Sequence, residues 1–150
     1  MYGIIKYEEG FREAPYLCSE GYVTIGYGTK LCNMKNADPE YFPIRVDKQI
    51  ANLLLIKDCE SIDESLRQYF SKVYINEPRY DVLVSMCYQL GTYGFSKFKN
   101  MILAIHSEDW NKAADEALDS RWAKQTPNRA KRHSEVLRSG TLKVYSGYLN

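Results

Sequence analysis

The sequence predicts a two-lobed α+β fold that is mainly helical, with a small N-terminal β-hairpin lobe, a long connecting helix and a C-terminal helical lobe. Residues 16–27 are rich in aromatic and β-branched residues and are punctuated by glycines, which is typical of a hairpin. From Val46 onward, apolar residues recur at helical spacing. A chain of 150 residues suits one domain. We therefore expect a single domain with a β-lobe over about 11–45, a connecting helix over about 46–70, and a helical lobe formed by about 75–150 and a helix over 2–9.

The N-terminal helix is predicted to bury Ile4 and Ile5 and to end at Gly10, a common terminator of helices. Glu9 would then lie in the last turn, beside a reversal of the chain. Pro15 prevents further helix, so the hairpin follows, with strands over 16–18 and 22–27 joined by a Ser-Glu-Gly turn. Residues 32–44 contain Asn, Asp and two prolines and are expected to form a loop.

The connecting helix is predicted from two runs of apolar residues at helical spacing, which are Val46, Ile50, Leu53 and Leu54, then Ile62, Leu66, Tyr69 and Phe70. Shorter helices are expected over 78–90, 95–106, 109–119 and 127–138. The last has the clearest start, with Thr126 as the expected N-cap and Pro127 at the first helical position, and Gly140 should end it.

The composition argues against several classes of protein. No apolar run approaches the roughly 18 residues of a membrane span, and two acids interrupt the N-terminus where a signal peptide has its apolar core. We therefore expect synthesis in a cytoplasm and no stable membrane insertion. The cysteines Cys18, Cys32, Cys59 and Cys87 form no CxxC pair, and only two histidines accompany them, so neither a metal site nor a disulfide framework is expected.

The net charge of +1 conceals an uneven distribution of charge along the chain. Residues 121–150 contain seven Lys or Arg and one acid, whereas the first 120 residues carry a net charge of −5. A basic C-terminal segment suggests an anionic partner, although a solvated helix face explains it equally well. No helix-turn-helix or stacking-platform pattern accompanies these charges, so we expect no nucleic-acid partner.

A constellation of polar residues gives the most specific signal. Glu9 is followed after eight residues by Cys18, and five further residues lead to Thr24 in the run Thr-Ile-Gly-Tyr-Gly. This pattern resembles the catalytic signature of the phage lysozymes of glycoside hydrolase family 24, in which the middle position is Asp or Cys. The segments Gln89–Gly91, Ser120–Trp122 and Gln125–Arg132 resemble the T-even phage branch, so the likeness covers almost the whole chain and is weakest over about 32–75.

The resemblance implies a lysozyme-like domain in which Glu9 protonates the leaving oxygen of a glycosidic bond. Glu8 is the rival carboxyl, but adjacent helical positions point about 100° apart, so one of the two faces a cleft. Arg129 matches the arginine that pairs with the catalytic glutamate in the family. A cationic partner favours the ionised acid, so we interpret Arg129 as orienting Glu9 before substrate binds.

Cys18 stands where many relatives carry Asp, and two roles are open for it. Its thiolate could attack the sugar and retain configuration, because thiolate is a strong nucleophile. Alternatively, Cys18 and Thr24 could position a water on the opposite face of the sugar and invert configuration. We favour the second role, since a threonine hydroxyl is suited to holding water and the Asp-bearing branch inverts.

Three further residues are predicted to bind substrate. Tyr16 and Tyr88 match aromatic positions of the family and would stack on sugar rings, although core packing explains Tyr88 equally well. Gln89 is expected to hydrogen-bond an acetamido group, and Trp122 is assigned to the core. Thr29 replaces a histidine, and Lys30, Met101 and Glu116 also depart from the T-even pattern, so substrate preference is expected to differ.

The function that the resemblance implies is that of an endolysin that hydrolyses the β-1,4 bond between N-acetylmuramic acid and N-acetylglucosamine in bacterial peptidoglycan, without metal or cofactor. Such an enzyme would be a monomer that stays in the host cytoplasm until lysis and then acts in the periplasm or cell wall, with a separate holin opening the membrane. A lytic transglycosylase and a non-catalytic glycan-binding virion domain are the alternatives.

Overall fold

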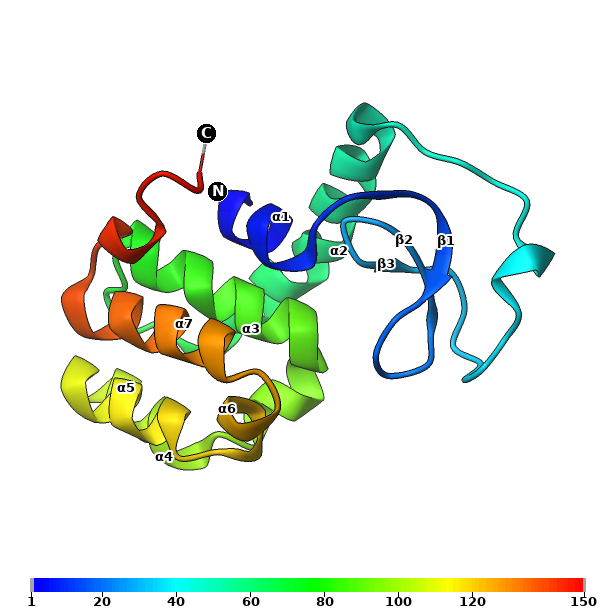
Figure 1. The fold of residues 1–150 in the computed structure, drawn as a ribbon. Helices are drawn as coiled ribbons and strands as arrows, with labels where there is room; N and C mark the ends of the chain where they lie inside the picture. The colour runs from blue at the N-terminus through cyan, green and yellow to red at the C-terminus, as the bar shows by residue number, and fades with distance from the viewer. Residues whose placement is uncertain (1, 150) are drawn as a thin grey trace. The chain divides into compact units, whose positions relative to one another are not determined.

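The computed structural model describes residues 2–149 and has the predicted mainly helical α+β class. Figure 1 shows the elements in chain order. They are α1 (Gly3–Glu9), β1 (Arg12–Leu17), β2 (Val23–Gly26), β3 (Thr29–Lys30), the 3₁₀ helix η1 (Pro39–Tyr41), α2 (Lys48–Tyr69), α3 (Glu77–Ser96), α4 (Lys99–His106), α5 (Trp110–Leu118), α6 (Arg121–Gln125), α7 (Pro127–Ser139) and the 3₁₀ helix η2 (Lys143–Tyr145).

The described chain divides into two compact units. The first, which we call the sheet unit, comprises Tyr2 and Ile4–Ser61, and the second, which we call the helical unit, comprises Gly3 and the residues from Ile62 onward. Helix α2 passes from one unit into the other, because the boundary falls between Ser61 and Ile62. Each unit is described below by itself.

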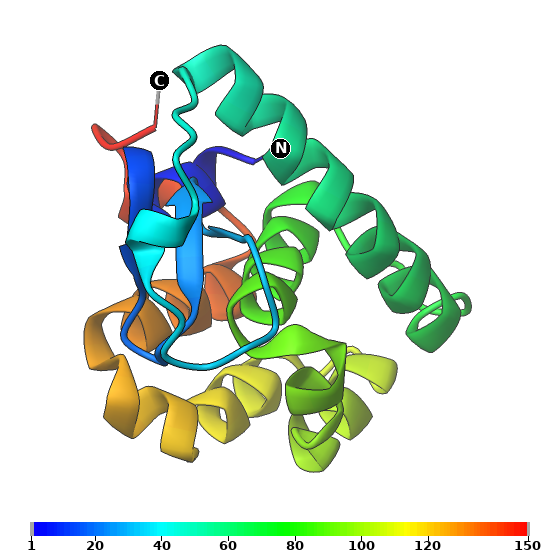
Figure 2. The ribbon, with the colours of Figure 1, turned by 90° about the vertical axis from the view of Figure 1, so that its right-hand side faces the viewer.

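The sheet unit contains three antiparallel strands in the order β1-β2-β3. The predicted hairpin corresponds to β1 and β2, whereas the short strand β3 was not predicted separately. Strand β1 begins at Arg12 and includes Pro15, which lacks the N–H group that a central strand would use. Pro15 is tolerated because β1 is an edge strand and its pairing with β2 is irregular between Arg12 and Tyr16. Figure 2 shows η1, in cyan, beside β1.

Gly26 lies where the backbone of β2 closely approaches α2. Its φ of 65° lies in the left-handed region, and a Cβ placed there would be 3.0 Å from the Cβ of Ala51 in α2. A side chain at position 26 would therefore suffer both backbone strain and a clash with the helix. The glycine lets β2 contact the first turns of α2.

The buried face of α2 differs from the prediction in its first half and at Tyr69, which is 39% exposed. Ile50 and Leu53 were expected to be buried, but 47% and 62% of their surface is exposed. The residues that face inward are Ala51, Leu55, Cys59, Ile62 and Leu66, at spacings of three and four that keep them on one side of the helix. The predicted stripe was wrong because it omitted Ala51 and Leu55, and the small side chain of Ala51 lets β2 approach the helix closely.

The helical unit is organised around α7, which packs against α3, α5, α6 and η2 (Figure 1). Helix α3 contains a kink at Gly91, with φ of 76° and ψ of 159°, so the helix predicted over 78–90 continues in a second segment as far as Ser96. Helix α4 consequently begins at Lys99 rather than at residue 95, and the short helix α6 was not predicted. The predicted core residue Trp122 is buried, and so are Cys59 and Cys87. Within residues 2–149, no helix is both long enough and apolar enough to cross a membrane.

Helix α7 begins at Pro127 and ends at Gly140, as predicted, but Thr126 does not cap it through its side chain. The Thr126 hydroxyl donates a hydrogen bond of 3.2 Å to the carbonyl oxygen of Trp122. The same carbonyl oxygen also accepts the backbone N–H of Thr126 at 2.9 Å, so the hydroxyl adds a second bond at the end of α6. The predicted cap was wrong because the preceding helix α6, which the sequence did not reveal, uses the hydroxyl instead.

The observed face of α2 predicts different costs for two leucines of the same helix. Leu55→Ala should lower the free energy of unfolding by about 2–5 kcal/mol, because its fully buried side chain would leave a cavity. Leu53→Ala, at an exposed position, should change it by less than about 0.5 kcal/mol. Chemical denaturation of both variants measures the two values. Equal losses would contradict the observed orientation of the helix.

Candidate active site

Glu9 is the last residue of α1, and the chain reverses directly after it. Gly10 ends the helix with φ of 68° and donates its N–H to the Lys6 carbonyl oxygen. Glu9 is half-buried, and Ile4 and Ile5 anchor the helix in the core. The last turn thus carries the carboxyl group on a short, firmly packed support.

The register of β1 against β2 places three predicted site residues together. Tyr16 lies directly opposite Thr24 in the antiparallel pair. Cys18 is two positions beyond Tyr16, so its side chain leaves the same face of the sheet and is a diagonal neighbour of Thr24. The Tyr22 carbonyl oxygen accepts hydrogen bonds of 2.9 Å from both the Cys18 N–H and the Thr24 hydroxyl. The turn therefore fixes the thiol and the hydroxyl relative to one backbone atom.

Tyr16 connects these residues electrostatically with Glu9. The pKa of Tyr16 is raised, first by burial of the phenol and then by the negative charge of Glu9, and Cys18 adds a smaller effect in the same direction. Arg12 opposes this shift and lies over the Tyr16 ring, 4.7 Å from its centroid. The phenol is therefore near both the carboxyl and the thiol within the sheet unit.

The pKa of the Cys18 thiol is lowered from its ordinary value. Partial burial raises this pKa, but hydrogen bonds from the Tyr22 and Glu20 backbone and from the Thr24 side chain together outweigh burial. The Glu20 charge weakly opposes them. Because thiolate is the reactive form, Cys18 is more easily activated near neutral pH than an ordinary cysteine.

The Thr24 hydroxyl can serve either of two partners, since it has one proton and two lone pairs. When it donates to Tyr22, its oxygen offers lone pairs to a Cys18 S–H group or to a water. When it rotates, it can donate to the thiolate. Thr24 is 3% exposed, so few alternative partners from solvent compete for it.

Arg129, Tyr88 and Gln89 belong to the helical unit. Arg129 is buried in the first turn of α7, and its Nη2 donates to the Ser85 Oγ at 2.9 Å and to the Ser85 carbonyl oxygen at 3.2 Å. Tyr88 is half-buried in α3. The Gln89 Oε1 accepts a hydrogen bond of 2.8 Å from the indole N–H of Trp122. The Gln89 Nε2 also donates to the Thr126 Oγ1 at 3.4 Å, so one of the two amide N–H groups is left to donate elsewhere.

Sequence reasoning did not find the residues that hold Arg129. No sequence motif includes Ser85, and His133 is one of only two histidines in the chain. The contacts of Ser85 with Arg129 and with His133 join α3 to α7, which are far apart in sequence. The one local signal is that Arg129 and His133 are four residues apart and so share a face of α7.

The basic C-terminal segment is partly internal in the structure. Arg129 is buried, and Arg138 forms an ion pair of 2.6 Å with Asp115 of α5. Four of the seven cations are exposed, namely Arg121, Lys124, Lys131 and Lys143. The surface charge available to an anionic partner is therefore smaller than the sequence suggests.

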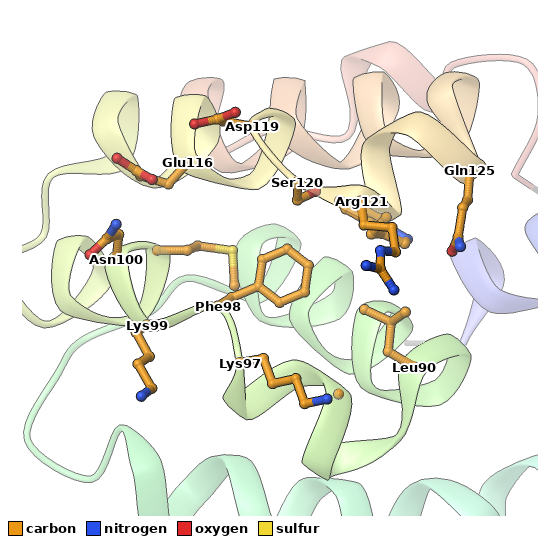
Figure 3. A pocket seen from close by; sticks show the side chains of 13 residues that line it. Leu90, Lys97, Phe98, Lys99, Asn100, Glu116, Asp119, Ser120, Arg121 and Gln125 are labelled. Carbon is orange, nitrogen blue, oxygen red and sulfur yellow. The ribbon is translucent and has the colours of Figure 1, made fainter.

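A cavity of about 520 Å³ opens within the helical unit, where α3, α4, α5 and α6 meet. Figure 3 shows Glu116 and Asp119 on one side of it, Lys97 and Lys99 on the other, and Phe98 between them. The lining of the cavity thus combines apolar side chains with charges of both signs. Among the described residues, no group of His, Cys, Asp and Glu side chains is placed to hold a metal ion.

A short helix, a three-stranded antiparallel sheet, a long helix and a following helical region form a lysozyme-like α+β fold. The sequence profile of the phage lysozyme family matches residues 6–138, and the chain belongs to this family.

Three similar proteins extend this finding. The pre-baseplate central spike protein Gp5 of Enterobacteria phage T4 is 28% identical over 165 residues, which cover 97% of this chain but 28% of the spike protein. Probable T4-type lysozymes 1 and 2 of Dictyostelium discoideum are 26% and 30% identical, and each alignment covers 95% of both chains. This chain therefore matches nearly the whole of two lysozymes and about a quarter of a larger spike protein.

The hydrogen bond between Thr24 and Cys18 predicts a measurable shift in thiol reactivity. Thr24→Val should raise the pKa of Cys18 and slow its alkylation by iodoacetamide at pH 7.5. The rate of modification against pH, resolved for each cysteine by peptide mass spectrometry, measures the midpoint. Cys32 serves as the internal control in the same protein and should not change. An unchanged Cys18 midpoint would contradict the assigned bond.

Proposed function

We propose that this protein hydrolyses the β-1,4 bond between N-acetylmuramic acid and N-acetylglucosamine in bacterial peptidoglycan. Membership of the phage lysozyme family implies peptidoglycan hydrolysis, which gives the substrate class. The observation that carries the finer assignment is that one compact unit contains Glu9, Tyr16, Cys18 and Thr24. Within it, the charges of both Glu9 and Cys18 raise the pKa of Tyr16.

In the proposed mechanism, Glu9 gives its proton to the glycosidic oxygen as the bond from that oxygen to the sugar's anomeric carbon breaks. A water held by Thr24 attacks the opposite face of the anomeric carbon, and the Cys18 thiolate takes the proton that this water loses. The products are a free hydroxyl on the leaving sugar and a reducing end of inverted configuration. The lowered pKa of Cys18 supports its role as proton acceptor.

Four further residues are assigned supporting roles. Tyr16 and Tyr88 would stack on sugar rings, and the Gln89 amide, held by Trp122, would bind an acetamido oxygen. Arg129 would support Glu9, as the family resemblance implies. The cavity of the helical unit, with charges of both signs, suits the peptide part of peptidoglycan, which carries both carboxylate and ammonium groups.

The biological role that we infer is that of a phage endolysin that remains in the host cytoplasm until a separate holin opens the membrane. It would then act in the periplasm and cell wall as a monomer, without a cofactor. Similarity to a spike protein favours a second role, as the wall-degrading part of a virion. Mass spectrometry of purified particles separates the two roles, because only a virion component would be present in them.

The assignment of Glu9 predicts a contrast between two adjacent glutamates. Glu9→Gln should lower the rate of turbidity loss of a peptidoglycan suspension by about 100- to 10,000-fold, because general acid catalysis contributes that much. Glu8→Gln is the matched control and should retain the wild-type rate. Equal effects of the two substitutions would contradict the assignment. An anhydro end on the products, seen by mass spectrometry, would instead indicate a transglycosylase, and an inactive wild type would indicate a binding domain.

The two roles of Cys18 predict opposite stereochemical outcomes. Hydrolysis of a soluble peptidoglycan fragment by the wild type should release the inverted anomer, as NMR recorded before mutarotation would show. Cys18→Ser should slow the reaction and keep the same anomer, because the serine oxygen can still position water. A retained anomer would establish a thioglycosyl intermediate and contradict the water-positioning role.

A further inference from the structure

A chain of four hydrogen-bonded side chains crosses the interior of the helical unit and ends on Arg129. The Arg129 Nη2 contacts Ser85 Oγ at 2.9 Å, Ser85 Oγ contacts His133 Nε2 at 2.7 Å, and His133 Nδ1 contacts Tyr145 Oη at 2.9 Å. All four residues are at least 93% buried. The chain joins α3, α7 and η2, so three elements cooperate in holding one guanidinium group.

The hydrogen bonds of this chain have a favoured direction. A guanidinium group has donors and no acceptor, so Ser85 Oγ accepts from Arg129. The Ser85 hydroxyl can then donate its single proton in a hydrogen bond to His133 Nε2. The imidazole proton is therefore on Nδ1, facing Tyr145 Oη. In this arrangement each group polarises the next in the same sense, which strengthens all three bonds.

The surroundings keep His133 neutral, as this arrangement requires. The pKa of His133 is lowered well below its usual value, first by burial and then by the charges of Arg129 and Arg132. A neutral imidazole with a bare Nε2 is an acceptor, whereas a charged one would present a second donor to Ser85. The edge of the Trp122 indole also packs against the ring and restricts its rotation.

We propose that His133, acting through Ser85, positions the guanidinium of Arg129 for the reaction. His133 and Ser85 are positioning residues, since neither is assigned a contact with substrate. The proposal rests on the proposed function, in which Arg129 supports the proton donor. Arg129 has several rotatable bonds, and a fixed acceptor at Ser85 Oγ reduces the number of places its charged end can occupy. Misplacement of a catalytic support by about 1 Å can cost 100-fold in rate.

The kinetic experiment compares two buried serines of similar environment. Ser85→Ala should lower kcat on a soluble peptidoglycan fragment by about 10- to 100-fold with little change in KM, because positioning matters most in the transition state. Ser134→Ala is the matched control, since Ser134 is 2% exposed, neighbours His133 in α7 and takes no part in the chain. It should leave kcat unchanged. Thermal unfolding of both variants checks that each is folded at the assay temperature.

Substitutions at His133 test whether its acceptor, rather than its bulk, is needed. His133→Leu should lower kcat as Ser85→Ala does, and the double variant should be no slower than either, because the two residues act as one unit. His133→Gln should restore much of the rate, since its amide oxygen can accept the Ser85 proton. Equal rates for the leucine and glutamine variants would overturn the proposal.

The tautomer of His133 distinguishes the proposed role from a purely structural one. Nitrogen-15 NMR of the labelled protein should show His133 neutral with its proton on Nδ1, and Ser85→Ala should shift its Nε2 resonance. A proton on Nε2 would overturn the proposed direction of the chain. If the wild type is active but Ser85→Ala and Ser134→Ala have the same kcat, this inference alone would be overturned. A fully active Arg129→Ala variant would have the same consequence. An inactive wild type would refute the proposed function as well.

Discussion

The register of β1 against β2 is the constraint on which the candidate site depends. It sets Tyr16 opposite Thr24 and brings Cys18 to the same face. Because side chains alternate between the two faces of a strand, a slip of one residue between the strands would turn Tyr16 and Cys18 to the face opposite Thr24. The register is held by the bonds around Tyr22 and by the fully buried side chains of Val23 and Ile25 on the opposite face. Packing of the core thus determines where the candidate site residues lie.

The helical unit uses a different means of placing a functional group. A buried cation costs free energy unless its hydrogen bonds are satisfied, and Arg129 meets this demand partly with Ser85. Removing a partner from such a buried network costs more than the net value of the bond, which favours a single arrangement. The hairpin fixes its groups through backbone pairing, whereas α7 fixes its arginine through side chains contributed by α3 and η2.

The sequence predicts most of the elements because their signals are local. Gly10 and Gly140 end helices, and the alternation around Thr24 indicates a strand. The predictions of the buried face of α2 and of the role of the Thr126 hydroxyl were wrong. Each feature depends on what packs nearby rather than on spacing along the chain. In the same way, the motif identifies candidate residues, but the contact between Ser85 and Arg129 joins distant segments and has no pattern along the chain.

If glycan is cleaved at the Cys18 face of the hairpin, selective modification of that thiol should abolish lytic activity. In a Cys32→Ser protein, the other two cysteines are buried, so iodoacetamide should modify Cys18. Residual lytic activity, plotted against the fraction of Cys18 modified in the same samples, should fall on a straight line to zero, and a soluble glycan fragment should slow the modification. Full activity in fully modified protein would contradict the claim.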